Sequence, residues 1–157
     1  ASEGLAGHVE VAGRRGTGYQ REIPLKGEFG NLRVRGRADG YDALTGQLEE
    51  VKTYCGQITA MRENHRRLHW AQLKVYGHLL CSRDGLTQIR LALVYFNIAT
   101  QEETLLVECY LACDLRVHFE AQCESYLAWA HFHTLHSGLG SVNSPRPSLS
   151  RPAAAAA

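Results

Sequence analysis

The chain has 157 residues, and its 17 Lys and Arg residues against 16 Asp and Glu residues give a formal net charge of +1. This length and a hydrophobic content of 45% suit one globular domain with a single core, and no apolar run approaches the ~20 residues that cross a bilayer. The near-neutral balance argues against a histone-like basic binder, but it does not exclude nucleic acid as a partner, because the positions of charges matter more than their sum.

Cysteine usage and the start of the sequence indicate a cytoplasmic protein. The cysteines are odd in number, scattered and without a Cys-x-x-Cys pair, so they do not form a disulfide framework. The segment Ala1–Ala12 has charges and glycines but lacks the apolar stretch of a signal peptide. We therefore expect buried, free thiols in a reducing compartment. The positions are Cys55, Cys81, Cys109, Cys113 and Cys123.

The spacing of apolar residues predicts the elements, with a period of 3.6 for helices and of 2 for strands. In chain order they are a helix over Ser2–Ala12, strands over Tyr19–Leu25, Asn31–Tyr41 and Gln47–Tyr54, a helix over His65–Cys81, strands over Thr87–Ala99 and Glu103–Ala112, and a helix over Asp114–His136. This order predicts an α/β fold with a central mixed β-sheet flanked by helices.

The same spacing assigns inward-facing positions to each helix. In the first helix they are Leu5, His8, Val9 and Ala12. In the second they are Leu68, Ala71, Gln72, Val75, Tyr76 and Leu79, and in the last they are Phe119, Cys123, Tyr126, Leu127, Ala130 and His133. In the second strand, small and apolar residues alternate with the row Arg33, Arg35, Arg37 and Asp39.

A change in composition after His136 marks the end of the predicted domain, which covers residues 2–136. Residues 137–152 are rich in Ser, Gly, Pro and Arg and have little that can form a core, so they are interpreted as a linker. The alanine run at 153–157 is interpreted as a placeholder or an added sequence and takes no part in the fold.

Two acidic residues and a lysine stand out on neighbouring strands. Asp39 lies near the end of the second strand, and Glu50 and Lys52 share a face of the third. Charges on the inner face of a sheet are costly unless they are paired or bind a metal. Mg²⁺ and Mn²⁺ prefer oxygen ligands, which the two carboxylates and the Val51 carbonyl can supply. The pattern therefore predicts metal-assisted phosphodiester hydrolysis, with Asp39, Glu50 and Lys52 as catalytic residues.

These residues resemble a known family. The run GRADG, which contains Asp39, followed by Glu50-Val-Lys52 resembles the PD-(D/E)XK nuclease superfamily, most closely its RecB-like branch, which includes CRISPR adaptation nucleases. The run GLAGH, ending at His8, is similar to that branch's N-terminal helix with a metal-binding histidine. The run QLKVY is similar to its Gln-x-x-x-Tyr helix. The motifs occur in the family's order, so the resemblance implies a restriction-endonuclease-like fold.

The resemblance implies a role for each matched residue. His8, Asp39 and Glu50, with the Val51 carbonyl, are expected to bind Mg²⁺ or Mn²⁺, and Lys52 is expected to be the catalytic lysine. Further residues are expected to contact DNA, either through the Gln-x-x-x-Tyr motif or through basic rows that flank the acidic site. These are Gln72, Tyr76, Arg35, Arg37, Arg66 and Arg67.

The longer runs GRADGYDALTGQLEEVKTYCG and HWAQLKVYGHLL are similar to nuclease domains found N-terminal to bacterial DinG-like helicases. This resemblance implies a DNA nuclease in DNA repair or processing that is covalently linked to a helicase domain. Its DNA is expected to be single-stranded or to have single-stranded ends. The cysteine positions do not match the upstream cysteine and C-terminal trio that hold an iron–sulfur cluster in many RecB-like nucleases, so no iron–sulfur cluster is expected.

Plainer interpretations stay open at each position. The two carboxylates can be ordinary surface charges of a hairpin, and Lys52 can simply pair with Glu49 or Glu50. His8 can be a core residue, the Gln-x-x-x-Tyr pair can serve packing, and the arginine rows can be solvated faces. For the whole domain, the alternatives are a catalytically silent DNA-binding module that guides strands to a helicase, and a stand-alone CRISPR-adaptation-type nuclease.

Overall fold

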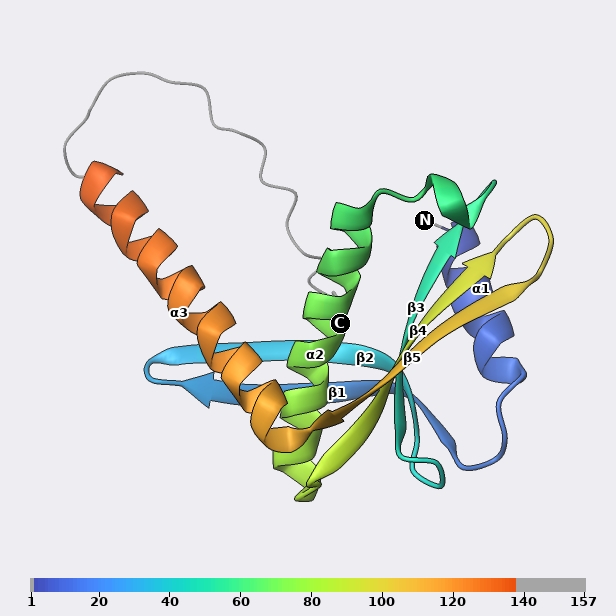
Figure 1. The fold of residues 1–157 in the computed structure, drawn as a ribbon, viewed down its shortest axis with the longest axis horizontal. Coiled ribbons are helices and arrows are strands. Elements are labelled where there is room, and N and C mark those ends of the chain that lie inside the picture. The colour runs from blue at the N-terminus through green and yellow to red at the C-terminus, as the bar shows by residue number, and fades with distance from the viewer. Residues whose placement is uncertain (1, 138–157) are drawn as a thin grey trace.

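The computed structural model of the chain describes residues 2–137. The expected linker beyond Ser137 and the alanine run lie outside the described residues. The elements in chain order (Figure 1) are α1 (Ser2–Gly13), β1 (Tyr19–Phe29), β2 (Leu32–Asp42), β3 (Gln47–Tyr54), the short 3-10 helix η1 (Ile58–Ala60), α2 (Glu63–Asp84), β4 (Gln88–Asn97), β5 (Glu103–Leu111) and α3 (Ala112–Ser137). The predicted order of helices and strands is confirmed.

The strands form one five-stranded sheet in the order β1-β2-β3-β4-β5. Neighbouring strands are antiparallel, except for β3 and β4, which run parallel and are connected through α2. A parallel pair needs such a crossover, whereas the antiparallel pairs are joined by short turns. The predicted α/β class with a mixed sheet is therefore confirmed.

The β1–β2 hairpin is longer than predicted. The expected end of the first strand at Leu25 is wrong, because Lys26 and Gly27 pair with β2 and the strand continues to Phe29. The turn comes at Gly30, whose φ of +55° lies in the left-handed region that glycine adopts without strain. The long hairpin reaches past the rest of the sheet and runs alongside α2 and α3 (Figure 1).

Helices cover both faces of the sheet (Figure 1). Val11 of α1 packs against Val94 and Phe96 of β4 in a small cluster on one face. Leu93 and Tyr95 belong to the larger cluster that faces α2. Because successive residues of a strand point to opposite faces, β4 contributes to both clusters.

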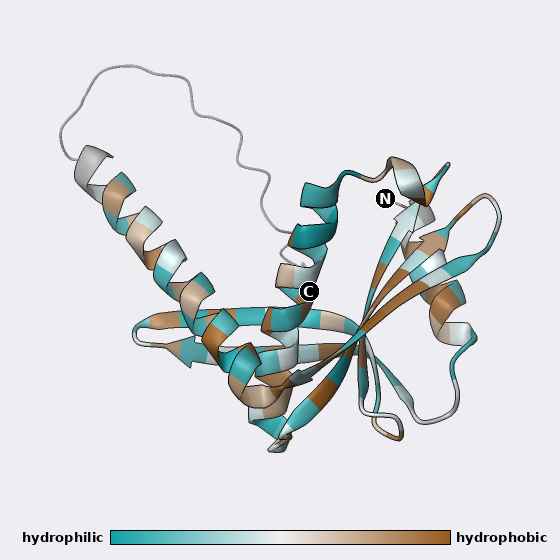
Figure 2. Cartoon of the chain, in the orientation of Figure 1, coloured by the Kyte–Doolittle hydropathy of each residue, from teal (hydrophilic) through white to brown (hydrophobic). Residues whose placement is uncertain are grey.

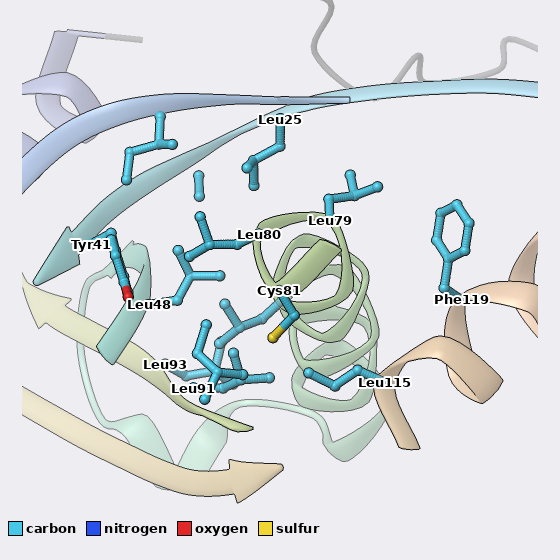
Figure 3. Packing of buried hydrophobic residues seen from close by; sticks show 14 of the residues in the cluster. Leu25, Tyr41, Leu48, Leu79, Leu80, Cys81, Leu91, Leu93, Leu115 and Phe119 are labelled. Atoms are coloured by element: carbon cyan, nitrogen blue, oxygen red, sulfur yellow. The ribbon is translucent and has the colours of Figure 1, made fainter. Parts of the chain in front are cut away.

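The larger cluster lies between the sheet, α2 and the first turns of α3 (Figure 3). Leu48 of β3 and Leu93 of β4 meet Leu80 of α2, while Leu115 and Phe119 bring in α3. All five side chains are buried. Burial of one such side chain is worth roughly 2 kcal/mol, so this cluster fixes α2 on the sheet.

The predicted inner faces of α1 and α2 are partly wrong. In α1, Leu5 and Val9 are exposed, and the buried positions are Gly7 and Val11. The helix therefore packs on the sheet through Gly7 and Val11 rather than through Leu5 and Val9. In α2, Leu68 is 65% exposed, because burial along this helix begins only at Leu73.

The predicted inner stripe of α3 is confirmed only in its first half. Phe119 and Cys123 are buried, but Tyr126 and Leu127 are 53% and 39% exposed. The reason is geometric, because the helix leaves the body of the molecule beyond its first turns (Figure 1). Apolar bands are visible along this projecting half in Figure 2. The exposed large side chains there include Trp129 and Phe132.

All five cysteines are free. Cys81 and Cys123 are buried, and burial raises the pKa of both thiols. The expectation of buried thiols is wrong for the other three, which lie at exposed positions of loops, β5 and α3. Within residues 2–137, no helix has both the length and the apolar character needed to cross a membrane.

Candidate active site

The predicted site lies where β2 and β3 separate. The two strands are paired only from Asp42 and Gln47 to Gly40 and Glu49. Beyond this point β3 stays paired with β4, while β2 pairs with β1 alone. Polar side chains at a fork of this kind lie at an edge of the sheet, where they can meet groups from helices on either face.

Asp39 connects β2, β3 and α1. Its Oδ2 accepts a hydrogen bond of 2.7 Å from the backbone N–H of Val51. Its Oδ1 lies 3.1 Å from Nδ1 of His8 in α1. The hydrogen bond to Asp39 raises the pKa of His8, with help from the negative charges of Asp39 and Glu50. The first and second motifs of the sequence are therefore in direct contact.

Gly7 lets α1 come close enough for this contact. A Cβ atom at position 7 would lie 2.5 Å from Cγ2 of Thr53 on β3 and 3.1 Å from Cδ1 of Phe96 on β4. Both neighbours belong to the sheet, and Phe96 is buried, so there is little room for them to move. The glycine next to His8 thus sets the distance between the helix and Asp39.

We expect Gly7→Ala to move α1 away from β3 and to break the contact between His8 and Asp39. The pKa of His8, followed by NMR titration of its ring protons, should fall back towards 6.5. Any activity that depends on His8 should drop roughly tenfold, because small misplacements of site groups are costly. Gly13→Ala is the matched control, since a Cβ at position 13 meets nothing within 4 Å. An unchanged His8 pKa in Gly7→Ala would contradict this account.

Glu50 and Lys52 form an ion pair on the face of β3 that α2 covers, in which Glu50 is buried and Lys52 is half-buried. Nζ of Lys52 donates a 2.8 Å hydrogen bond to Oε1 of Glu50, and Oε2 of Glu50 is buried without a hydrogen-bond partner. Burial, and then the nearby charge of Asp39, raise the pKa of Glu50 to about 7 against the opposing effect of Lys52. The single contact with Lys52 therefore does not fully compensate the buried negative charge of Glu50.

Two residues of α2 continue the contacts from Lys52. Nζ of Lys52 donates to Oε1 of Gln72 at 3.2 Å, and Nε2 of Gln72 donates to the hydroxyl of Tyr76 at 3.0 Å. The ring of Tyr76 lies against Gly36 of β2, where a Cβ atom would overlap it. The Gln-x-x-x-Tyr motif is thus in contact with both strands of the fork.

The predicted arginines are placed differently from one another. Arg35 and Arg37 are exposed and share the strand face of Asp39, and Arg37 lies 3.8 Å from Glu22. On α2, Arg67 is exposed, but Arg66 is half-buried and its Nε has no hydrogen-bond partner. The strand arginines thus form a row that leads to Asp39, whereas Arg66 is turned towards the interior.

Sequence reasoning missed the role of Glu49, the neighbour of Glu50. Glu49 is 2% exposed and is held by Arg15 at 3.0 Å, by the hydroxyl of Tyr19 at 3.1 Å and by Nε2 of Gln47 at 2.8 Å. These bonds fasten the loop after α1 to β3. The alternation of side chains along a strand could have predicted this role, because Glu49 must point to the opposite face from Glu50. A buried carboxylate on that face needs hydrogen-bond partners of its own.

His69 on α2 is the second residue that sequence reasoning did not assign to the site. Its Nδ1 lies 2.9 Å from the hydroxyl of Tyr95, a fully buried residue of β4. Tyr95 is the register partner of Lys52 across the parallel β3–β4 pair. Only its position in the sequence pointed to this site, because His69 lies one helical turn before Gln72 and therefore on the same face of α2.

The donor set at the fork fits a hard divalent cation. Asp39 and Glu50 supply carboxylate oxygens, and the unpartnered, buried Oε2 of Glu50 is an acceptor that a cation satisfies. In residues 2–137, however, no three or more His, Cys, Asp or Glu side chains are already gathered as a metal site. His8 contacts Asp39 directly, and Lys52 takes one oxygen of Glu50.

The fold defines an α/β protein with a five-stranded mixed sheet flanked by helices. No protein-family model matches the sequence, and no curated protein matches it. Among solved structures, the chain is similar to one described as "Crystal structure of SSO0001", with a TM-score of 0.49 and 18% sequence identity. The match covers 74% of this chain and 56% of that one, so this chain spans little more than half of its structural neighbour. A likeness of this size carries no argument about activity.

Proposed function

We propose that this chain is a divalent-metal-dependent DNA nuclease domain of the PD-(D/E)XK type. The observation that carries the proposal is the meeting of four motifs that are far apart in the sequence. His8 contacts Asp39, Asp39 is bonded to the β3 backbone beside Glu50, and Lys52 joins Glu50 to Gln72. Unrelated surface charges would not be expected to form one connected group across two strands and two helices. We call this group the contact set; its members are His8, Asp39, Glu50, Lys52, Gln72 and Tyr76.

Asp39 and Glu50, with His8 and the Val51 carbonyl, are the groups that would hold Mg²⁺ or Mn²⁺. When bound, such an ion lowers the pKa of a water ligand and stabilises negative charge on a phosphate. The carboxylate of Asp39 is close enough to Glu50 to raise its pKa. A bound cation would offset this repulsion and favour the ionised form of both carboxylates.

Lys52 and the basic row supply the remaining functions that phosphodiester hydrolysis requires. The ammonium of Lys52 is held by Glu50 and Gln72 and is preorganised to meet charge that develops on a phosphate. Arg35 and Arg37 present positive charge along the strand that leads to Asp39, which suits a phosphate backbone. Together these groups favour a nucleic acid over a small phosphate ester.

The proposal extends to the context of the domain. The similarity of its motif runs to nuclease domains of DinG-like helicases supports a nuclease–helicase that processes single-stranded DNA or DNA with single-stranded ends. A silent DNA-binding module is the competing function. The retention of both carboxylates and of the lysine in one contact set favours the enzyme.

Digestion of end-labelled single- and double-stranded DNA tests the proposal. We expect cleavage with Mg²⁺ or Mn²⁺, none with EDTA, and loss of cleavage in Asp39→Asn. Asp84→Asn is the matched control, because Asp84 pairs with Arg83 at the end of α2. DNA binding without any metal-dependent cutting would favour the silent module, and equal cutting by Asp39→Asn would show that the site is assigned wrongly.

A further inference from the structure

His69 lies beside the contact set without belonging to it. It is on α2, one turn before Gln72, and its ring packs against Tyr95 with the ring centroids 5.8 Å apart. Tyr95 is the register partner of Lys52, and the charge of Lys52 contributes to lowering the pKa of His69. His69 is thus connected to the site through Tyr95, as Gln72 is connected to it through Lys52.

The contacts of Tyr95 determine which nitrogen of His69 carries the proton. The Arg66 guanidinium lies beside the Tyr95 hydroxyl and opposes the rise in its pKa that burial causes. A guanidinium has donors but no acceptor, so it cannot take the phenolic proton. A buried phenolic proton needs an acceptor, and Nδ1 of His69 lies 2.9 Å from the hydroxyl, so we assign the hydroxyl as the donor to Nδ1 and the imidazole proton to Nε2.

The imidazole is also kept uncharged. Burial, the charge of Lys52 and the nearby His65 lower the pKa of His69 to about 4. At neutral pH the ring is thus a neutral group with one fixed N–H donor. Among the residues described, Nε2 has no protein hydrogen-bond partner. A donor held in one tautomer by buried groups is suited to a ligand that can only accept.

We propose that Nε2 of His69 binds a non-bridging oxygen of one backbone phosphate of the nucleic acid, next to the phosphate that Lys52 meets. This inference rests on the proposed function. A phosphate oxygen accepts hydrogen bonds and does not donate them, and the positive charge of Lys52 acts at the imidazole, while Arg66 lies beside Tyr95. Tyr95 then acts as the positioning residue, because it fixes the tautomer from the buried side.

A scan with methylphosphonate oligonucleotides, each with one neutral linkage, tests the proposal. Affinity is measured by fluorescence anisotropy in EDTA, and cleavage is measured with Mg²⁺ or Mn²⁺. For wild type, the oligonucleotide whose methylphosphonate replaces the phosphate contacted by His69 should bind more weakly than unmodified DNA. His69→Phe should bind unmodified DNA about tenfold more weakly than wild type does. At that linkage alone, the methylphosphonate should cost His69→Phe clearly less affinity than it costs wild type, because the hydrogen bond from Nε2 is already absent.

Two variants separate a phosphate contact from a structural role. His69→Gln keeps an N–H donor at a similar reach and should restore most of the affinity. Tyr95→Phe removes the hydroxyl but keeps the packing, and it should reproduce the loss at the same linkage. Its near-isosteric change keeps the test decisive even where His69→Phe does not fold.

Several outcomes would overturn the inference. Equal losses at every linkage, no rescue by His69→Gln, or wild-type affinity in both His69→Phe and Tyr95→Phe would each contradict it. Its failure is distinguishable from that of the proposed function. A wild-type protein that binds DNA but never cuts it refutes the nuclease, whereas the binding scan still decides on His69.

Discussion

Replacing Lys52 by alanine should lower metal-dependent cleavage by about 100- to 1000-fold, the usual cost of removing one preorganised charge from a developing anion. The ammonium is held by Glu50 and Gln72, so no other group of this contact set can take its place. The loss should appear in kcat rather than in KM, because most phosphate contacts of the substrate are made elsewhere. Single-turnover digestion of end-labelled DNA measures it.

Lys74→Ala is the matched control for this prediction. Lys74 lies on α2, two positions after Gln72, but its ammonium sits over the ring of Tyr110 on β5, 5.0 Å from the ring centroid. Its removal takes the same charge from the domain and should leave kcat unchanged. If Lys52→Ala and Lys74→Ala lose activity equally, Lys52 contributes only to the general charge and is not a catalytic residue.

Glu50→Gln should abolish cleavage and yet make the metal-free protein more stable. The ionised Glu50 carboxylate is buried, lies near Asp39 and has one oxygen without a partner. A neutral amide avoids this cost and still accepts the bond from Lys52. We expect a gain of roughly 2 kcal/mol at pH 8, or a rise in Tm of about 5 °C. Differential scanning calorimetry in EDTA measures the change.

The pH dependence of this gain has a defined sign. The pKa of Glu50 is raised from 4.5 in the unfolded chain to about 7 in the folded one, so the folded state holds more protons between these values. Wild-type stability therefore declines across this window as pH rises. Glu50→Gln lacks this titration, so its advantage should be small below pH 4.5, grow up to about pH 7 and stay constant above it.

Glu49→Gln provides a control of opposite sign. Glu49 is also buried, but Arg15, Tyr19 and Gln47 satisfy its carboxylate, so the amide loses an ion pair and Tm should fall. Added Mn²⁺ should stabilise wild type more than Glu50→Gln, because Glu50 is one of the groups that bind it. If both glutamate substitutions lower Tm in EDTA at pH 8, the account of Glu50 is wrong.

The strands and the proximity of Asp39 to Glu50 and Lys52 could be predicted from the sequence because their signals are local. The alternation of Arg35, Arg37 and Asp39 with smaller residues defines the face of β2, and the same period puts Glu50 and Lys52 on one face of β3. The contact between these strands follows from the short turn that joins them. Their meeting with His8 and Gln72 was predicted only through the resemblance to a family.

Other features could not be predicted because they depend on how far each helix extends over the sheet. Leu68 and Tyr126 fit a helical stripe, but both side chains are more than half exposed. The opposite holds for Gly7, which has no side chain to mark it as an inner position. Burial of a whole face requires a partner surface, and the sequence period does not give the length of that surface.

The packing of α1 on β4 has a consequence for the nascent chain. Residues of α1 leave the ribosome before the strands, but Val11 finds Val94 and Phe96 only after more than 80 further residues have been made. A chain that ends before β4 has His8 and Asp39 without the surface that brings them together. The order of synthesis therefore delays completion of the site until most of the domain has folded, and a truncated translation product would carry the acidic strands without an assembled centre.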